Sequence, residues 1–250
     1  MRTLYGICLA LVVTAITVGV LGSTAPATLL ERLVPEELPL RFAACSGKLL
    51  RSGTCQVFLR GNSGWLHAGV FSYAWGFKPD PGVHLTLQQD GRRAGIFQPS
   101  FEGWQAKDID LRTQLMLPGV LPKNSVDAWQ LTGRQVMSAP VLACSWRASD
   151  CTGRLRIEVA DLTIGRLGRD AVGSYGLDLE FAQERRVTGR LSTLSGPLTL
   201  DGQFEKSPVS GMRASGRAKP GAGVSDDLRR LLTDIARRED ANTFVYSFPQ

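Results

Sequence analysis

The stretch Gly189–Phe204, GRLSTLSGPLTLDGQF, is the most regular segment of this 250-residue chain. Side chains along an extended chain point alternately to the two faces of a sheet. The residues that share one face are Leu198, Leu200, Gly202 and Phe204, and those on the other are Thr199, Asp201 and Gln203. This division predicts a β-strand with one buried and one solvent-exposed face.

Similar alternation recurs along the chain. Its apolar positions are Val57 and Leu59, Leu85 and Leu87, Leu111 to Leu117, Leu155 to Val159, and Tyr175 to Phe181. Proline and glycine clusters such as KPDPG at 78–82 and LPGVLPKN at 117–124 separate the runs, as turns do. The tripeptide TGR occurs three times, which indicates either a row of similar strands or simply a glycine-rich fold. We expect residues 41–250 to form a mainly β domain, an elongated, curved antiparallel sheet.

One short helix is expected near the C-terminus, at about 225–238. Ser225 is a favourable N-cap, and Arg237 and Arg238 would close the C-terminal end, where positive charge is favourable. The apolar positions with the i, i+3, i+4, i+7 spacing of a helix are Leu228, Leu231, Leu232 and Ile235. A final strand is expected at 243–248.

The N-terminus predicts a membrane anchor. Leu4–Gly22 is 19 residues without a charge, long enough to cross a bilayer core of about 30 Å as a helix. A cleaved secretory signal is the alternative, since Ala25-Pro26-Ala27 resembles a small-x-small cleavage site. Arg2 favours a cytoplasmic N-terminus. We therefore expect the cytoplasmic N-terminus and anchor at 1–24, a linker at 25–40, and the main domain across the membrane.

The cysteines outside the expected anchor form two close couples, Cys45 with Cys55 and Cys144 with Cys151. Four cysteines allow three connectivities, of which only the local one needs no assumption about the fold. We therefore expect two local disulfides, and with them an oxidising compartment. A zinc site with four cysteine ligands is a rival interpretation, although neither couple has CxxC spacing. Free buried thiols are the other alternative.

The residues that carry chemistry in enzymes are sparse. His67 and His84 are the two histidines, and both are expected on strand surfaces. Asp108 and Asp110 would share one strand face, either as a carboxylate pair or as solvated acids. No nucleophile elbow, phosphate-binding loop or dinucleotide motif is present. The tryptophans (Trp65, Trp75, Trp104, Trp129 and Trp146) are expected in core or rim packing. We expect no catalytic residue, cofactor or metal.

The net charge of +6 comes mostly from arginine. A basic chain can bind nucleic acid or an anionic membrane surface. The arginines, however, occur in pairs rather than long runs, and no nucleic-acid-binding module accompanies them. We expect solvated arginines on the outer positions of strands and no nucleic-acid partner.

Several segments together resemble protein N of the type II (general) secretion pathway. LPLRFAACSGKLLRSGTC at 38–55 resembles that family's early apolar stretch followed by repeated Ser-Gly pairs. GSYGLDLE at 173–180 and VTGRLSTLSGPLTLDGQF at 187–204 are similar to its glycine-punctuated strands. The leucine-rich helix and aromatic strand at 228–248 also fit. The resemblance covers nearly the whole chain in order, although the chain has Leu50 for an aromatic and lacks the family's Asp-x-x-Gly-Arg turn.

This resemblance implies an accessory inner-membrane component of the type II secretion system, which exports folded proteins across the outer membrane. It implies a non-enzymatic periplasmic binding or scaffold domain whose partners are other secretion components. The alternative is a periplasmic lipid-handling sheet of the envelope-lipid-transport type, and an envelope hydrolase is a third hypothesis. A second layer over the apolar strand face would favour protein binding, and an open apolar trough would favour lipid.

Overall fold

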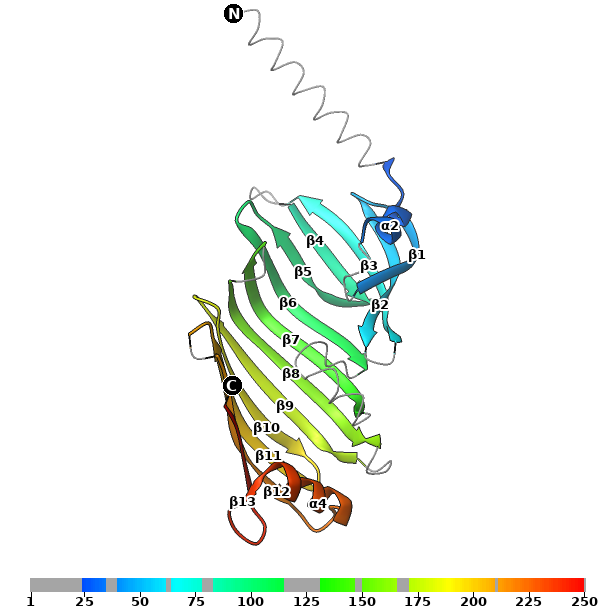
Figure 1. Cartoon of the computed structure of the whole chain (residues 1–250). Coiled ribbons are helices and arrows are strands. Elements are labelled where there is room, and N and C mark those ends of the chain that lie inside the picture. Colours follow the sequence, from blue (N-terminus) through cyan, green and yellow to red (C-terminus); the bar gives the residue numbers. More distant parts are fainter. Residues whose placement is uncertain are drawn as a thin grey trace, which may run out of the picture.

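The computed structural model describes residues 24–34, 40–61, 64–77, 83–114, 131–146, 150–165, 171–209 and 211–249. They form one open antiparallel sheet of 14 strands, which is long and curved (Figure 1). Strands β1 to β12 follow one another in chain order, and β14 then lies between β12 and β13. The prediction of a mainly β chain built on an antiparallel sheet is confirmed.

The elements have the following bounds. The strands are β1 (Leu40–Lys48), β2 (Ser52–Gly61), β3 (Gly64–Phe77), β4 (Val83–Gln89), β5 (Arg92–Pro99), β6 (Gly103–Gln114), β7 (Leu131–Ser145), β8 (Cys151–Ile164), β9 (Ala171–Ala182), β10 (Arg186–Ser195), β11 (Leu198–Ser207), β12 (Gly211–Pro220), β13 (Arg237–Arg238) and β14 (Phe244–Pro249). The helical elements are η1 (Ala27–Leu29), α2 (Leu30–Leu33) and α4 (Asp226–Ile235).

The segment Gly189–Phe204 forms most of β10, a tight turn, and the first part of β11. Gly189 lies opposite Phe204 in the register of these two strands. A Cβ added at Gly189 would lie 2.0 Å from the Cε1 atom of Phe204, so the aromatic ring occupies the space above the glycine. Tyr246 covers Gly202 and Gly216 in the same way. Glycine is therefore required where an aromatic ring of a neighbouring strand lies flat on the sheet.

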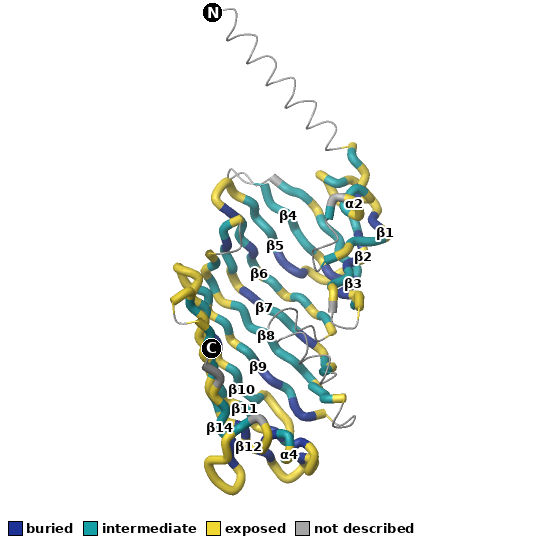
Figure 2. Tube along the Cα trace, in the orientation of Figure 1, coloured by how far each residue is buried: buried dark blue, intermediate teal, exposed yellow. Residues whose placement is uncertain are grey.

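The sheet has little enclosed core. Among the described residues, Cys55 is the largest whose side chain is less than 2% exposed, and most strand residues are half-buried (Figure 2). The fully buried residues gather mainly at the two ends of the sheet. One cluster centres on Ala27, Cys45 and Cys55, and the other combines α4 with strand residues such as Leu198 and Phe244. Between these ends, side chains pack mainly against neighbours in the same layer.

Helix α4 is shorter than predicted. Ser225 is its N-cap, and the Ser225 Oγ accepts a hydrogen bond from the Leu228 N–H. The prediction that Arg237 and Arg238 end the helix is wrong, because these residues form β13 and pair with β14. The helix ends at Ile235, and the two extended residues of β13 then form backbone hydrogen bonds with the outer edge of β14. If the helix continued for another half-turn, this edge would have no backbone partner there.

The N-terminal described residues pack on the first strands. Ala27 is fully buried against Cys45 and Cys55, and Leu30 packs beside them. The Glu31 carboxylate accepts a hydrogen bond of 2.7 Å from the Cys45 N–H. Because β1 is an edge strand, this bond occupies a backbone donor that would otherwise face solvent.

No helix within the described ranges is long and apolar enough to cross a membrane. The expected anchor at Leu4–Gly22 lies outside the described residues and stays a prediction.

Gln89 joins two strands that have no direct backbone pairing. The β4–β5 hairpin turns at Asp90 and Gly91, and beyond this turn β3 and β6 approach each other. The Gln89 side-chain amide donates to the carbonyl oxygens of Ala68 at 2.6 Å and Arg112 at 2.5 Å, and its oxygen accepts from the Arg112 N–H at 2.9 Å. The buried side chain thus supplies the hydrogen bonds that a neighbouring strand would give.

Both predicted cysteine couples lie at disulfide distance. The two Sγ atoms are 2.08 Å apart in the Cys45–Cys55 couple and 2.12 Å apart in the Cys144–Cys151 couple. The first joins β1 to β2 and the second joins β7 to β8, each across one hairpin.

We predict that both couples are oxidised in the mature protein. Mapping of non-reduced peptides by mass spectrometry should recover both linked pairs, and four free thiols would contradict the prediction. Replacing Cys144 and Cys151 together by serine should lower the free energy of unfolding by about 2.5 kcal/mol, as expected for closure of so short a loop.

Tyr175 ties β9 to the C-terminal end of the sheet. Its side chain is only 5% exposed, and its hydroxyl lies 3.2 Å from the Val172 carbonyl oxygen and 3.0 Å from that of Leu198. The single hydroxyl hydrogen is shared between these two acceptors. Burial raises the pKa of Tyr175 to about 12, because the phenolate form would lose its hydration.

Tyr175 therefore makes stability fall at alkaline pH. Its contribution is complete below pH 10, the pKa of an unfolded tyrosine, and is lost as the pH rises through 12. Urea unfolding should show a loss of about 1.4 kcal/mol from this group by pH 11. The variant Tyr175→Phe should be about 1 kcal/mol less stable than the wild type at pH 8.

The difference between the two proteins should then shrink as the pH rises and reverse in sign by pH 11, because the loss of about 1.4 kcal/mol exceeds the initial difference of about 1 kcal/mol. A difference that stays constant from pH 8 to pH 11 would contradict the role of the buried phenol.

Candidate interaction faces of the sheet

The two faces of the sheet have opposite chemistry. On one face Leu155 lies opposite Leu179, and Ile157 lies opposite Leu177. We call this the apolar face. Both α2 and α4 lie against it at opposite ends of the sheet (Figure 1). The described helices thus cover only its ends.

The other face, the polar face, carries ion pairs within strands and between them. The Arg156 Nη1 lies 3.1 Å from Asp178 Oδ1 on β9, and its Nε lies 2.7 Å from Glu158 Oε1 on β8. The hydrogen bond to Glu158, with a further contribution from Asp178, raises the pKa of Arg156. A second ion pair joins the same two strands: the Arg154 Nη2 lies 3.5 Å from Glu180 Oε1.

Similar pairs extend across the polar face. They are Arg93 with Asp108, Arg112 with Asp110, Arg134 with Asp161, Arg186 with Glu205, and Arg217 with Glu239. Their side chains are about half exposed or more. Exposed pairs of this kind contribute roughly 0–1 kcal/mol each, so they define the surface more than they stabilise the fold.

The polar face is hollowed between β7 and β14. The hollow has a volume of about 1440 Å³, and both Asp201 and Gln203 line it. Leu198 and Leu200, which alternate with these residues on β11, pack toward α4 instead. On β11, Asp201 and Gln203 therefore line the hollow, whereas Leu198 and Leu200 face the helix.

Two arginines in the hollow lack a charged partner. Arg190 on β10 and Arg213 on β12 line it, and within the described part of the chain neither forms an ion pair or a side-chain hydrogen bond. Arg190 lies opposite Asp178 in the register, but Asp178 bonds to Arg156 instead. The hollow thus presents two guanidinium groups that are free to bind carboxylate or phosphate.

The two histidines lie far apart along β3 and β4. His67 is exposed and its ring contacts Phe58, with the ring centroids 5.1 Å apart. His84 is half-buried over Gly76, and its Nδ1 has no hydrogen-bond partner. The structure brings neither histidine to Asp108 or Asp110.

Asp108 and Asp110 each pair with a separate arginine. Asp108 Oδ2 lies 2.8 Å from Arg93 Nη2, and Asp110 Oδ2 lies 3.4 Å from Arg112 Nη2. Both carboxylates are about half exposed or more. This geometry supports the interpretation of solvated surface acids over that of a carboxylate pair.

The tryptophans have several surroundings. Trp104 contacts Phe97, and Trp75 donates its indole hydrogen to the Leu49 carbonyl oxygen at 3.0 Å. Trp65 and Trp146 are exposed, whereas we expected the tryptophans in core or rim packing. Trp129 lies outside the described residues.

The hollow and the ion pairs were not predicted from the sequence. Charged residues at alternate positions, as in Arg154, Arg156 and Glu158, were visible as a signal for a polar face. The register that sets Arg156 opposite Asp178 is a property of strand pairing, which one strand's sequence does not specify.

Comparison with known families matches residues 61–245 to the family described as type II secretion system (T2SS), protein N. No curated protein and no solved structure gave a significant match. The matched region runs from the end of β2 into β14, more than half of the chain. The chain therefore belongs to the protein N family of the type II secretion system, the family of an accessory secretion component.

Proposed function

We propose that this protein is a non-enzymatic scaffold of the type II secretion system. In this proposal residues 4–22 hold it in the inner membrane, and the sheet lies in the periplasm. Family membership supports the secretion role, and the expected anchor and two cysteine couples support the compartment. The partners are other inner-membrane or periplasmic components of the machine.

The observation that carries the binding role is the polar hollow. Three of its four acids, Asp178, Glu180 and Glu205, pair with neighbouring arginines, whereas Arg190, Arg213 and Asp201 form no ion pair within the described residues. Guanidinium groups bind carboxylates through charge-assisted hydrogen bonds of about 1.5–3 kcal/mol. A partner that presents acidic side chains to the hollow fits this surface.

Reversing both free arginines should impair secretion. The double variant Arg190→Glu, Arg213→Glu breaks no ion pair within the described residues, so the fold should be retained. Loss of two such contacts should weaken partner binding by at least about tenfold. The measurements are the amount of folded cargo secreted by cells and the recovery of cross-linked secretion components from membranes.

The matched control is Arg41→Glu, Arg60→Glu, which changes two exposed arginines of β1 and β2 outside the hollow. Normal secretion by both double variants would exclude the hollow as the binding surface. Alanine at His67, His84, Asp108 or Asp110, each singly, should leave secretion near normal. If one of these folds and reaches the membrane but is inactive, the hydrolase hypothesis replaces the scaffold.

A second candidate function is lipid handling. Of the described elements, helices cover only the ends of the apolar face, so its middle strands offer half-buried leucine and isoleucine side chains to an apolar occupant. An acyl chain would bury this surface without any polar contact.

A photoreactive benzoylphenylalanine at Phe181 or at Ala182 distinguishes the two candidates. These neighbours on β9 point to opposite faces, and Phe181 is close in shape to the probe. If the apolar face handles lipid, Phe181 should yield phospholipid adducts and Ala182 should not. For the scaffold we expect protein adducts from Ala182 and no lipid adduct from Phe181.

A further inference from the structure

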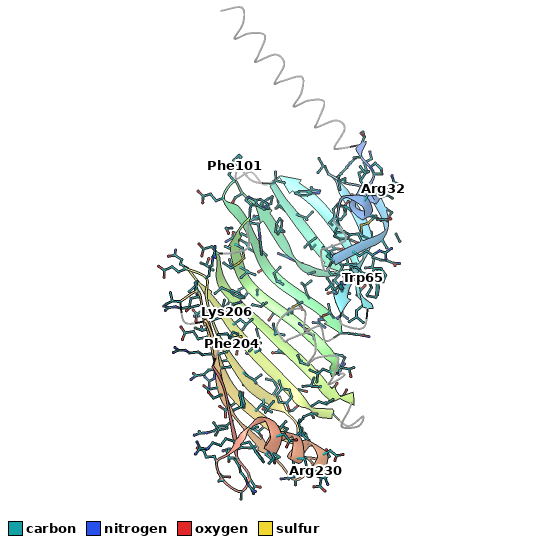
Figure 3. All side chains as sticks on the ribbon, in the orientation of Figure 1. Arg32, Trp65, Phe101, Phe204, Lys206 and Arg230 are labelled. Carbon is teal, nitrogen blue, oxygen red and sulfur yellow. A yellow bond between two sulfur atoms is a disulfide. The ribbon has the colours of Figure 1, made fainter. Side chains whose placement is uncertain are left out.

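Two aromatic side chains are exposed on neighbouring turns. Phe101, in the β5–β6 turn, is 105% exposed, and Trp146, after β7, is 55% exposed. The indole hydrogen of Trp146 is donated to the carbonyl oxygen of Ser100 at 3.0 Å, so the two turns are in contact. Figure 3 shows Phe101 at an outer corner of the sheet. Large aromatic side chains exposed together mark interaction surfaces more than single exposed residues do.

Both turns are held by short-range contacts. The Ser100 Oγ accepts a hydrogen bond from the Gly103 N–H, and the Ser100 N–H donates to the Gly103 carbonyl oxygen. The Cys144–Cys151 couple closes the β7–β8 hairpin next to Trp146. The aromatic side chains are therefore presented on constrained backbone.

These turns lie on the side of the sheet where the chain enters. In an antiparallel meander, every turn from an odd-numbered strand to the next even-numbered one lies on the same side, so the β1–β2, β5–β6 and β7–β8 turns share a side. The Leu49 N–H in the β1–β2 turn donates to the Ala25 carbonyl oxygen at 2.8 Å, and Pro26 pairs with Lys48. The uncharged stretch Leu4–Gly22 thus precedes a segment fastened to this side.

The β1–β2 turn on the same side of the sheet also carries side chains that suit a membrane surface. Leu50, at the tip of the β1–β2 turn, is 48% exposed and stands between Lys48 and Arg51. Basic residues beside apolar ones favour the surface of an anionic bilayer. Trp65, by contrast, lies across the sheet from Phe101 (Figure 3), beside the β2–β3 connection.

We infer that this side of the sheet docks on a lipid bilayer, with Phe101 and Trp146 in its interfacial region. Tryptophan, an apolar ring system with one polar edge, prefers this region, and Phe101 adds exposed apolar area beside Trp146. The entry of the chain from the expected anchor brings this side of the sheet close to the membrane. The inference rests on the membrane placement in the proposed function. Docking would fix the orientation of the sheet above the membrane, which one point of attachment to the bilayer would not.

The test uses the full chain reconstituted in vesicles of phosphatidylethanolamine and phosphatidylglycerol, with nitroxide-labelled phospholipid as the quencher. Tryptophan fluorescence should be quenched more by a label at carbon 5 than at carbon 12 of the acyl chain. The variant Trp146→Phe should lose most of this quenching, whereas the control Trp65→Phe should keep it. Phe101→Ser should also reduce the quenching, because it removes the exposed aromatic side chain that would enter the bilayer beside Trp146.

Retention of the chain in the vesicles after an alkaline carbonate wash tests the anchor separately. A retained chain whose quenching does not depend on Trp146 would overturn the docking inference and leave the anchor intact. Trp146-dependent quenching by a chain that the wash removes would contradict the anchor and support docking. If Phe101→Ser abolishes secretion although Trp146 is never quenched by lipid, the aromatic pair binds a protein and the inference is wrong.

Discussion

Backbone pairing between successive strands is the constraint on which this structure depends. With no second layer among the described elements over most of the sheet, few side chains are removed from water on all sides. Each strand is held mainly by the hydrogen bonds and the lateral packing of its two neighbours. Where the ladder is interrupted, side chains replace it: Gln89 bridges β3 and β6, and Glu31 occupies the edge of β1. Covering structure is limited to the ends, where α2 and α4 enclose small clusters.

This dependence explains why glycine and aromatic residues are paired across strands. A single layer gains apolar contacts only within its own plane, so a ring that lies flat over a neighbouring strand buries more area than one that stands upright. Gly189 beneath Phe204, and Gly202 and Gly216 beneath Tyr246, leave the space that such a ring requires. The glycine content is therefore a packing requirement at these positions.

A single-layer sheet also keeps both faces available for binding. Ion pairs spread over the polar face contribute little to stability, yet they neutralise most of its acids and leave Arg190 and Arg213 as free charges in the hollow. The turns at one side carry exposed aromatic residues, and the chain enters on that side. These features are the basis of the proposal that the sheet offers one surface to a partner and another to a membrane.

The sequence by itself determined the strand class, the division of strand faces, the helix N-cap at Ser225 and the local pairing of the cysteines. These follow from alternation, spacing and capping, which are properties of neighbouring residues. Only the tertiary structure decided that Arg237 and Arg238 leave the helix to pair with β14, that Gln89 joins two strands, and that Arg156 meets Asp178. Each of these depends on which residues strand pairing brings opposite one another. A shift of register by one residue would move every such side chain to the other face, and no local pattern specifies that choice.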